Sequence, residues 1–142
     1  MHNQTGTEPI RIVARYINGR IIKGWTPDFF PKKPSFHVYK SISEAAGEGV
    51  QVFLKELKAV FFVKNLDGNP SYDERKEFVK EQILHGRRIE VSFKDGEMLV
   101  GTTTGYDPQR EGFFLFPVDP QSNNLRIYII SSAVKKVRFI TG

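Results

Sequence analysis

Residues 24–39, which read GWTPDFFPKKPSFHVY, concentrate the side chains of this chain that could recognise another molecule. Three aromatic rings and two cations stand close together there: Trp25, Phe29, Phe30, Lys32 and Lys33. Rings of this kind stack on nucleic acid bases and ammonium groups contact phosphates, but the same residue types also anchor protein interfaces. The segment is therefore a candidate binding surface for a protein partner or, alternatively, for RNA or single-stranded DNA. A third possibility is that the rings only cover the protein core.

The rest of the chain offers no pattern for catalysis or metal binding. His2, His37 and His85 lie far apart in sequence, and none has a second histidine or carboxylate at a spacing that matches a metal site. We expect His37 on a strand, as an edge or lining residue. No glycine motif for phosphate or dinucleotide binding is present. The sequence therefore predicts a protein that is not an enzyme and needs no cofactor or metal ion.

Composition narrows the setting in which the protein works. The 142 residues include no cysteine, so disulfides and thiolate metal sites are excluded and a reducing cytoplasm is the expected location. The first ten residues lack an apolar leader, and no apolar run is long enough to span a bilayer. The net charge of +5 is a mild excess that is compatible with an anionic partner but does not require one.

The elements that must position these residues occur twice. Residues 12–63 align with residues 89–140 at a constant shift of 77 positions, without gaps. Nine of the aligned pairs are identical: Ile12/Ile89, Gly19/Gly96, Gly24/Gly101, Thr26/Thr103, Pro31/Pro108, Phe36/Phe113, Lys58/Lys135, Val60/Val137 and Phe62/Phe139. Shared turns, glycines and apolar rhythm at one offset indicate an internal duplication.

Each copy carries the signals of five short strands. In the second copy, Ile89, Val91 and Phe93 alternate with polar residues, as in a half-buried strand. The pair Asp95-Gly96 then predicts a tight hairpin, because both turn positions require positive φ. Gly101 in the return strand marks a bend. The first copy repeats these features with Asn18, Gly19 and Gly24.

The segment between the copies predicts a helix. Ser71 is a suitable N-cap, Phe78, Ile83 and Leu84 form an apolar face, and Gly86 ends the run. We accordingly expect a first small β-barrel at residues 10–63, a linker with a short helix at residues 64–88, and a second small β-barrel at residues 89–140.

The hairpin motif also carries a family resemblance. Residues 89–107, IEVSFKDGEMLVGTTTGYD, resemble the first sequence motif of Sm-like proteins, and residues 12–26, IVARYINGRIIKGWT, resemble a weaker version of it. The whole chain is similar to uncharacterised bacterial proteins with this double pattern. The resemblance implies an all-β fold of two tandem Sm-like or SH3-like five-stranded barrels joined by one short helix.

The same comparison argues against the usual Sm-like RNA pocket. Sm-like RNA binders place an asparagine between strands two and three and an Arg-Gly turn between strands four and five. Here the corresponding segments read DPQREG and SSA in the second copy, and FFPKKPS and LKE in the first. We therefore expect a non-catalytic binding or adaptor module with a regulatory role. A protein is the favoured partner, nucleic acid is the alternative, and a homo-oligomer remains open.

Overall fold

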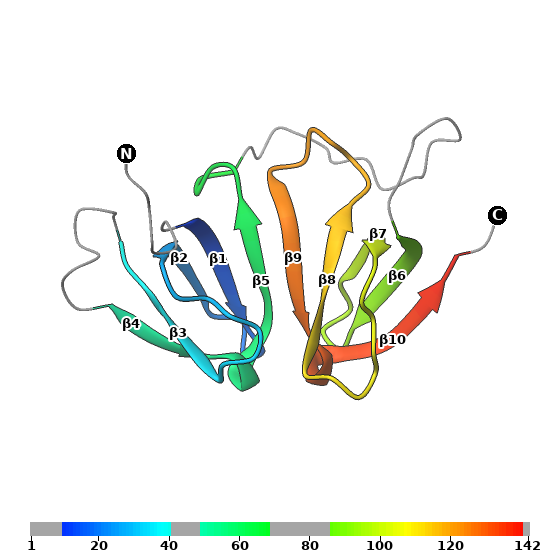
Figure 1. The fold of residues 1–142 in the computed structure, drawn as a ribbon, viewed down its shortest axis with the longest axis horizontal. Helices are drawn as coiled ribbons and strands as arrows, with labels where there is room; N and C mark the ends of the chain where they lie inside the picture. The colour runs from blue at the N-terminus through cyan, green and yellow to red at the C-terminus, as the bar shows by residue number, and fades with distance from the viewer. Residues whose placement is uncertain (1–9, 41–48, 69–85, 141–142) are drawn as a thin grey trace.

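The computed structural model describes residues 10–40, 49–68 and 86–140, and this part of the chain is built from ten strands and two short 3-10 turns (Figure 1). The predicted all-β class is confirmed. The described ranges contain no α-helix, and therefore none that could cross a membrane. The helix predicted from Ser71 lies at residues 69–85, outside the described residues.

The first half of the chain forms two hairpins and a returning strand. Its elements are β1 (Ile10–Tyr16), β2 (Ile21–Thr26), β3 (Ser35–Val38), β4 (Val50–Phe53), the 3-10 turn η2 (Leu54–Glu56) and β5 (Leu57–Val63). Strand β1 pairs with β2 on one side and with β5 on the other, and β3 pairs with β4. A single bridge between Trp25 and Tyr39 connects the end of β2 to the chain that follows β3.

The second half repeats this order. Its elements are β6 (Arg87–Phe93), β7 (Met98–Thr103), β8 (Gly112–Pro117), β9 (Asn124–Ile130), the turn η3 (Ser131–Ala133) and β10 (Val134–Phe139). Strand register is the same in both halves when 77 is added: Ile12 faces Gly24 as Ile89 faces Gly101. Likewise, Phe36 faces Val52 as Phe113 faces Ile129.

The turn between β1 and β2 and the turn between β6 and β7 have matching geometry. Gly19 has a φ of +94° and Gly96 a φ of +97°, a backbone conformation that residues with a Cβ rarely adopt. The side chain of Asn18 accepts a hydrogen bond from the backbone N–H of Arg20 at 3.0 Å, and Asp95 accepts one from Glu97 at 2.9 Å. Among the described residues only glycines have positive φ, so the expectation of positive φ at both turn positions is right for Gly19 and Gly96 and wrong for Asn18 and Asp95. The same local sequence nevertheless gives both hairpins the same turn.

Gly24 and Gly101 occupy equivalent bends where two strands cross closely. A Cβ at Gly24 would collide with the backbone carbonyl oxygen of Tyr39, and one at Gly101 would collide with that of Phe116. Because these neighbours are backbone atoms, they cannot move aside as a flexible side chain could. Only glycine allows β2 and β7 to bend over the following strand.

The prediction of two tandem five-stranded barrels is wrong. Strand β5, the last of the first half, pairs antiparallel with β9 of the second half, and Val60 lies opposite Tyr128. Eight strands thereby form one sheet in the order β10-β6-β7-β8-β9-β5-β1-β2, with β3 and β4 as a separate two-stranded sheet. Among the described strands no barrel closes, because β5 and β9 satisfy each other's edges across the centre of the molecule (Figure 1).

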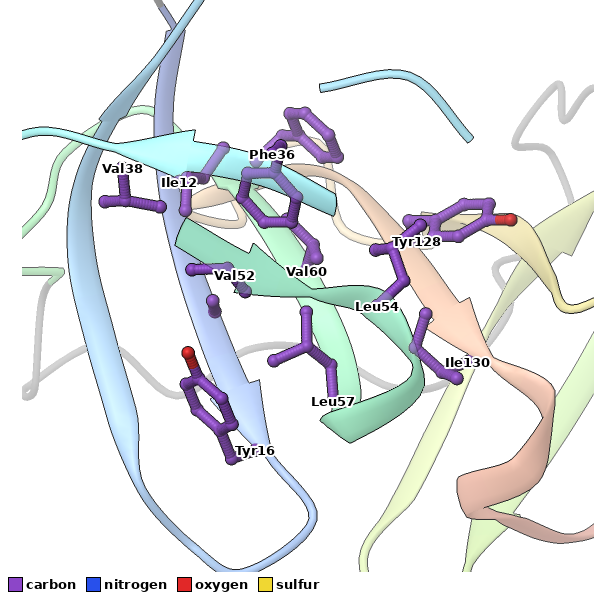
Figure 2. Close-up of a cluster of buried hydrophobic side chains, with 12 residues drawn as sticks. Ile12, Tyr16, Phe36, Val38, Val52, Leu54, Leu57, Val60, Tyr128 and Ile130 are labelled. Atoms are coloured by element: carbon purple, nitrogen blue, oxygen red, sulfur yellow. The ribbon is translucent and has the colours of Figure 1, made fainter. Parts of the chain in front are cut away.

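The shared sheet separates two apolar cores, one on each of its faces. All seven residues of β5 are buried, and alternate residues enter opposite cores. The first core receives Tyr128 and Ile130 from β9 in addition to residues of the first half (Figure 2). The second core receives four residues of the first half: Val13, Ala59, Phe61 and Val63. Each half therefore completes the core of the other.

Candidate binding groove

The candidate loop connects β2 to β3, and its first ring belongs to the core. Phe29 makes edge-to-face contacts with Phe36 at 5.2 Å, Phe62 at 5.1 Å and Tyr128 at 5.5 Å between ring centroids. Such contacts stabilise aromatic pairs beyond the burial of their area. Phe29 therefore closes the end of the first core and ties the loop to β5 and β9.

The residues that follow point away from the core. Phe30, Lys32 and Lys33 are exposed, with 42% of Phe30 accessible. The Lys33 ammonium lies 5.0 Å from the centroid of the Phe30 ring, a cation-π distance. These three residues and Pro31 line one wall of an open groove of about 920 Å³.

The opposite wall of this groove comes from the second half of the chain. It is formed by the loop between β7 and β8, including Thr104, Gln109, Arg110 and Glu111. The aromatic side chains Phe113, Phe114 and Tyr128 of β8 and β9 add apolar surface between the walls. A smaller hollow of about 320 Å³ shares Arg110 and Tyr128 and continues toward Lys55. We call the larger space the interloop groove, because it lies between two loops of different halves.

The interloop groove carries more positive than negative charge. Its lining includes three cations, Lys32, Lys33 and Arg110, against one carboxylate, Glu111. Arg110 is loosely held, since its Nε lies 3.7 Å from Asp107 and most of its side chain is exposed. Burial raises the pKa of Tyr128, so its hydroxyl remains protonated and can donate a hydrogen bond.

A carboxylate fixes the loop that forms the first wall. Asp28 accepts a hydrogen bond at 2.9 Å from the backbone N–H of His37, and its other oxygen lies 2.8 Å from His37 Nδ1. The hydroxyl of Thr26 donates a third bond at 3.1 Å. Partial burial alone would raise the pKa of Asp28, but the hydrogen bonds from His37 and Thr26 outweigh it and hold that pKa below its ordinary value. The loop is therefore pinned at both ends.

Trp25 is not part of the interloop groove. It lies on β2, half-buried, and the Arg11 guanidinium stands 5.0 Å from the centre of its ring. In the register of β1 with β2, Trp25 faces Arg11, on the side of the sheet opposite the first core. The structure thus brings together Phe30, Lys32 and Lys33, places Phe29 beneath them in the core, and places Trp25 elsewhere.

Sequence reasoning missed half of the groove. Arg110, Glu111, Phe114 and Tyr128 all lie in the second half of the chain, far in sequence from the candidate segment at residues 24–39. The Asp28–His37 pair was missed because a span of nine residues separates its members. The internal alignment could have indicated the second wall of the groove. Residues 104–111 correspond to residues 27–34, so the chain has two equivalent loops, and each of them forms one wall.

The lining of the groove offers contacts that could hold another molecule. In the described ranges, no group of three His, Asp or Glu side chains could hold a metal ion. The lining residues of the groove include no histidine or cysteine to act as a base or nucleophile. What the walls provide is apolar contact area, three cations and hydrogen-bonding groups.

Comparison with known proteins gives a family but no activity. The sequence matches DUF6982, a family of unknown function, over residues 8–141, and the chain belongs to that family. No curated protein and no solved structure matches it.

Proposed function

We propose that this DUF6982 protein is a non-catalytic binding module that holds a segment of a partner protein in the interloop groove. The observation that carries this proposal is the composition of the groove, whose two walls come from different halves and meet over the rings of Phe113, Phe114 and Tyr128. Concave, largely apolar sites with a few polar groups are the usual form of a binding site.

The ring geometry favours a protein over a nucleic acid at this groove. Single-stranded nucleic acid binding uses several exposed rings on which successive bases stack. Of the three rings in the candidate loop, only Phe30 reaches the groove, because Phe29 is packed in the core and Trp25 lies on another face. One exposed ring beside apolar surface is better suited to an anchoring side chain of a protein.

The preference of the groove is for an acidic segment. Lys32, Lys33 and Arg110 offer positive charge on both walls, and Glu111 is the single opposing carboxylate in the lining. Complementary charges increase association rates and select among partners. The pinned loop, held by Asp28 and His37, lowers the conformational entropy lost on binding.

The common register of the two halves supports a further part of this proposal, namely that they descend from one duplicated five-stranded unit. The turns, bends and strand pairs match at one offset of 77 residues. In this view the groove is a product of the duplication, because neither half supplies both walls. A family member with a single unit should therefore lack the groove.

Site-specific photocrosslinking in the native cell tests the proposed function. A photoreactive phenylalanine at Phe30 should trap a discrete protein, whereas the same residue at Met98, which is equally exposed and outside the groove, should not. Replacing Lys32 and Lys33 by Glu should weaken the Phe30 product, and Lys94→Glu serves as the control. Nuclease treatment separates the alternatives, because a product that disappears with nuclease would identify nucleic acid and contradict a protein partner.

A further inference from the structure

The outer face of the β1–β2 hairpin carries a second set of recognition residues. Pairing places Arg11 opposite Trp25, Val13 opposite Lys23 and Arg15 opposite Ile21. Because side chains alternate along a strand, these six residues share the face that points away from the first core. This set, which we call the β1–β2 basic face, lies on the opposite side of the sheet from Phe62 and Tyr128, the rings that contact the groove loop.

The cations of this face are exposed and stand beside rings. Arg11, Arg15 and Lys23 are exposed, and none of them pairs with a carboxylate among the described residues. The Arg11 guanidinium is 5.0 Å from the Trp25 ring, and that of Arg15 is 5.4 Å from the Phe61 ring. The face therefore combines uncompensated positive charge with a half-buried indole.

The second half shows that the fold does not require this set. The positions equivalent to Arg11, Arg15, Lys23 and Trp25 are occupied by Arg88, Ser92, Val100 and Thr102. The same hairpin, with the same register, is thus built with one cation and no ring. Arg15, Lys23 and Trp25 therefore have no equivalent in the second hairpin, and the pairing of the strands does not require them.

We propose that the β1–β2 basic face binds single-stranded nucleic acid. Trp25 offers a stacking platform for a base, while Arg11, Arg15 and Lys23 contact phosphates. Arg11 lies level with Trp25, and Arg15 is four residues farther, roughly 13 Å along an extended strand. The two guanidinium groups therefore offer one phosphate contact beside the ring and one farther along the strand. With a protein in the interloop groove and a nucleic acid on the far face of the sheet, the molecule would act as an adaptor.

A hollow at the edge of this face supports the choice of ligand. It measures about 300 Å³ and is lined by Arg15, Lys23 and the amide side chains of Asn123 and Asn124. Its two carboxylates are Asp67 and Glu97, and Glu97 is already paired with the Lys58 ammonium. The Asn123 amide already bonds the backbone N–H and C=O of Asn65, so Asn124 is the lining amide that suits the polar edge of a base. The hollow can thereby receive a base next to the one stacked on Trp25.

Intrinsic fluorescence gives a direct test, because Trp25 is the only tryptophan of the chain. Titrating the full-length protein with oligo(U) and with oligo(dT) of about twelve nucleotides should quench Trp25 in at least one case, and the pair separates RNA from DNA. Three phosphate contacts predict that affinity falls about 15- to 20-fold between about 50 and 200 mM salt. Arg11→Gln with Lys23→Gln should flatten this dependence, and Trp25→Leu should weaken binding at least about tenfold when followed by anisotropy of a labelled oligonucleotide. Lys33→Gln and Lys94→Gln are the matched controls and should change little.

Three outcomes would overturn the proposal. One is the absence of quenching at low salt with either oligonucleotide. Another is binding that is lost on Lys32→Glu with Lys33→Glu but unaffected by Arg11→Gln, which would move the nucleic acid to the groove and also contradict the proposed function. The third is equal quenching by polyglutamate, which would indicate an acidic protein as the ligand. Loss of the photocrosslink at Phe30 alone leaves the basic face unaffected, so the two proposals fail separately.

Discussion

Strands β5 and β10 occupy equivalent positions in the two halves, yet one lies at the centre of the sheet and the other at its edge. Ala59, Phe61 and Val63 of β5 are buried in the second core. The equivalent residues of the second half are Lys136 and Arg138 of β10 and Ile140, which directly follows it. Both cations are exposed. The strand that must pair on both sides is apolar on both faces, whereas the strand that must not pair is charged.

A lysine shared by both strands shows the same contrast. Lys58 is 7% exposed, and its Nζ lies 2.7 Å from Asp95 Oδ2 and also pairs with Glu97 of the opposite half. Its equivalent, Lys135, is exposed. In the first half, the hairpin positions that match Asp95 and Glu97 are occupied by Asn18 and Arg20. If the first half of another molecule packed against β10, Lys135 would therefore face the cation of Arg20 and no carboxylate.

If the two halves derive from one duplicated unit, as proposed above, this difference accounts for why the sheet does not continue beyond two units. If every unit exposed an edge like that of β5, pairing would continue from molecule to molecule. Apolar residues, Lys58 and its carboxylates make the β5–β9 junction favourable, and charge on β10 makes its continuation unfavourable. The following substitutions test that account by exchanging features of the junction and the edge.

Ala59→Lys should have the largest effect. It places at the junction the residue that β10 carries at Lys136, and it forces a charged side chain into a fully buried site. We expect a loss of at least about 3 kcal/mol in the free energy of unfolding, measured by denaturant titration. Lys136→Ala is the matched control, with a change of about 0.5 kcal/mol or less. Equal effects of the two would show that the junction does not hold the sheet together.

Lys58→Met should have an intermediate effect. The substitution keeps the side-chain volume but leaves Asp95 and Glu97 without their cation, although both carboxylates retain access to water. A loss of about 1 to 2 kcal/mol is expected from denaturant titration. Lys135→Met, at the exposed equivalent, should change stability by less than about 0.5 kcal/mol.

At low pH, the difference in unfolding free energy between the native protein and Lys58→Met should become smaller. The Lys58 ammonium donates to Asp95 and, with a backbone N–H from Glu97, holds the pKa of that carboxyl below its ordinary value of about 3.8. A depressed carboxyl pKa stabilises the fold above the unfolded pKa, and this stabilisation is lost as pH falls through the folded pKa. The stability difference between the two proteins should therefore be constant near neutral pH and shrink below about pH 4. A difference that does not vary down to pH 2 would exclude the pairing with Asp95 as its cause.

Removing the charge of the edge should have the smallest effect on stability and a visible effect on association. Lys136→Val with Arg138→Val gives β10 apolar residues at two exposed positions. Arg138 also pairs with Glu90 at 2.9 Å, so we expect a loss of up to about 1 kcal/mol in unfolding free energy, together with concentration-dependent oligomers in analytical ultracentrifugation. A double variant that stays monomeric at all concentrations would show that charge is not what keeps this edge unpaired.

Local features of the fold were predictable from the sequence, and the pairing of distant strands was not. Turns such as Asp95-Gly96 and bends such as Gly101 follow from backbone conformation that a few adjacent residues determine. Whether β5 closes on its own half or pairs with β9 is a choice between two edges with the same hydrogen-bonding groups. The apolar character of β5 at nearly every position indicated burial on both faces, but burial alone does not name the partner strand.

The candidate site likewise contains residues that the sequence predicted and residues that it did not. Phe30, Lys32 and Lys33 were identified because they are adjacent in sequence, and the structure places them on one wall of the groove. Phe29 has the same residue type as its neighbour but points the other way, toward Phe62, which depends on the loop conformation that Asp28 and His37 fix. The residues of the second wall could not be predicted in the same way, because they join the groove only through the packing of the two halves against each other.

The central position of β5 has a consequence for the order in which the chain can fold during synthesis. Residues 57–63 leave the ribosome long before their second neighbour, β9, which ends at Ile130. At about 5 to 20 residues per second, the 67 residues from 64 to 130 take roughly 3 to 13 s to translate. During that interval the edge LKAVFFV can pair with β1 on one side only, and its other side is open to neighbouring nascent chains. The second half of the protein thus serves the first as a covering strand that arrives late, and a chaperone that holds β5 would act in this interval.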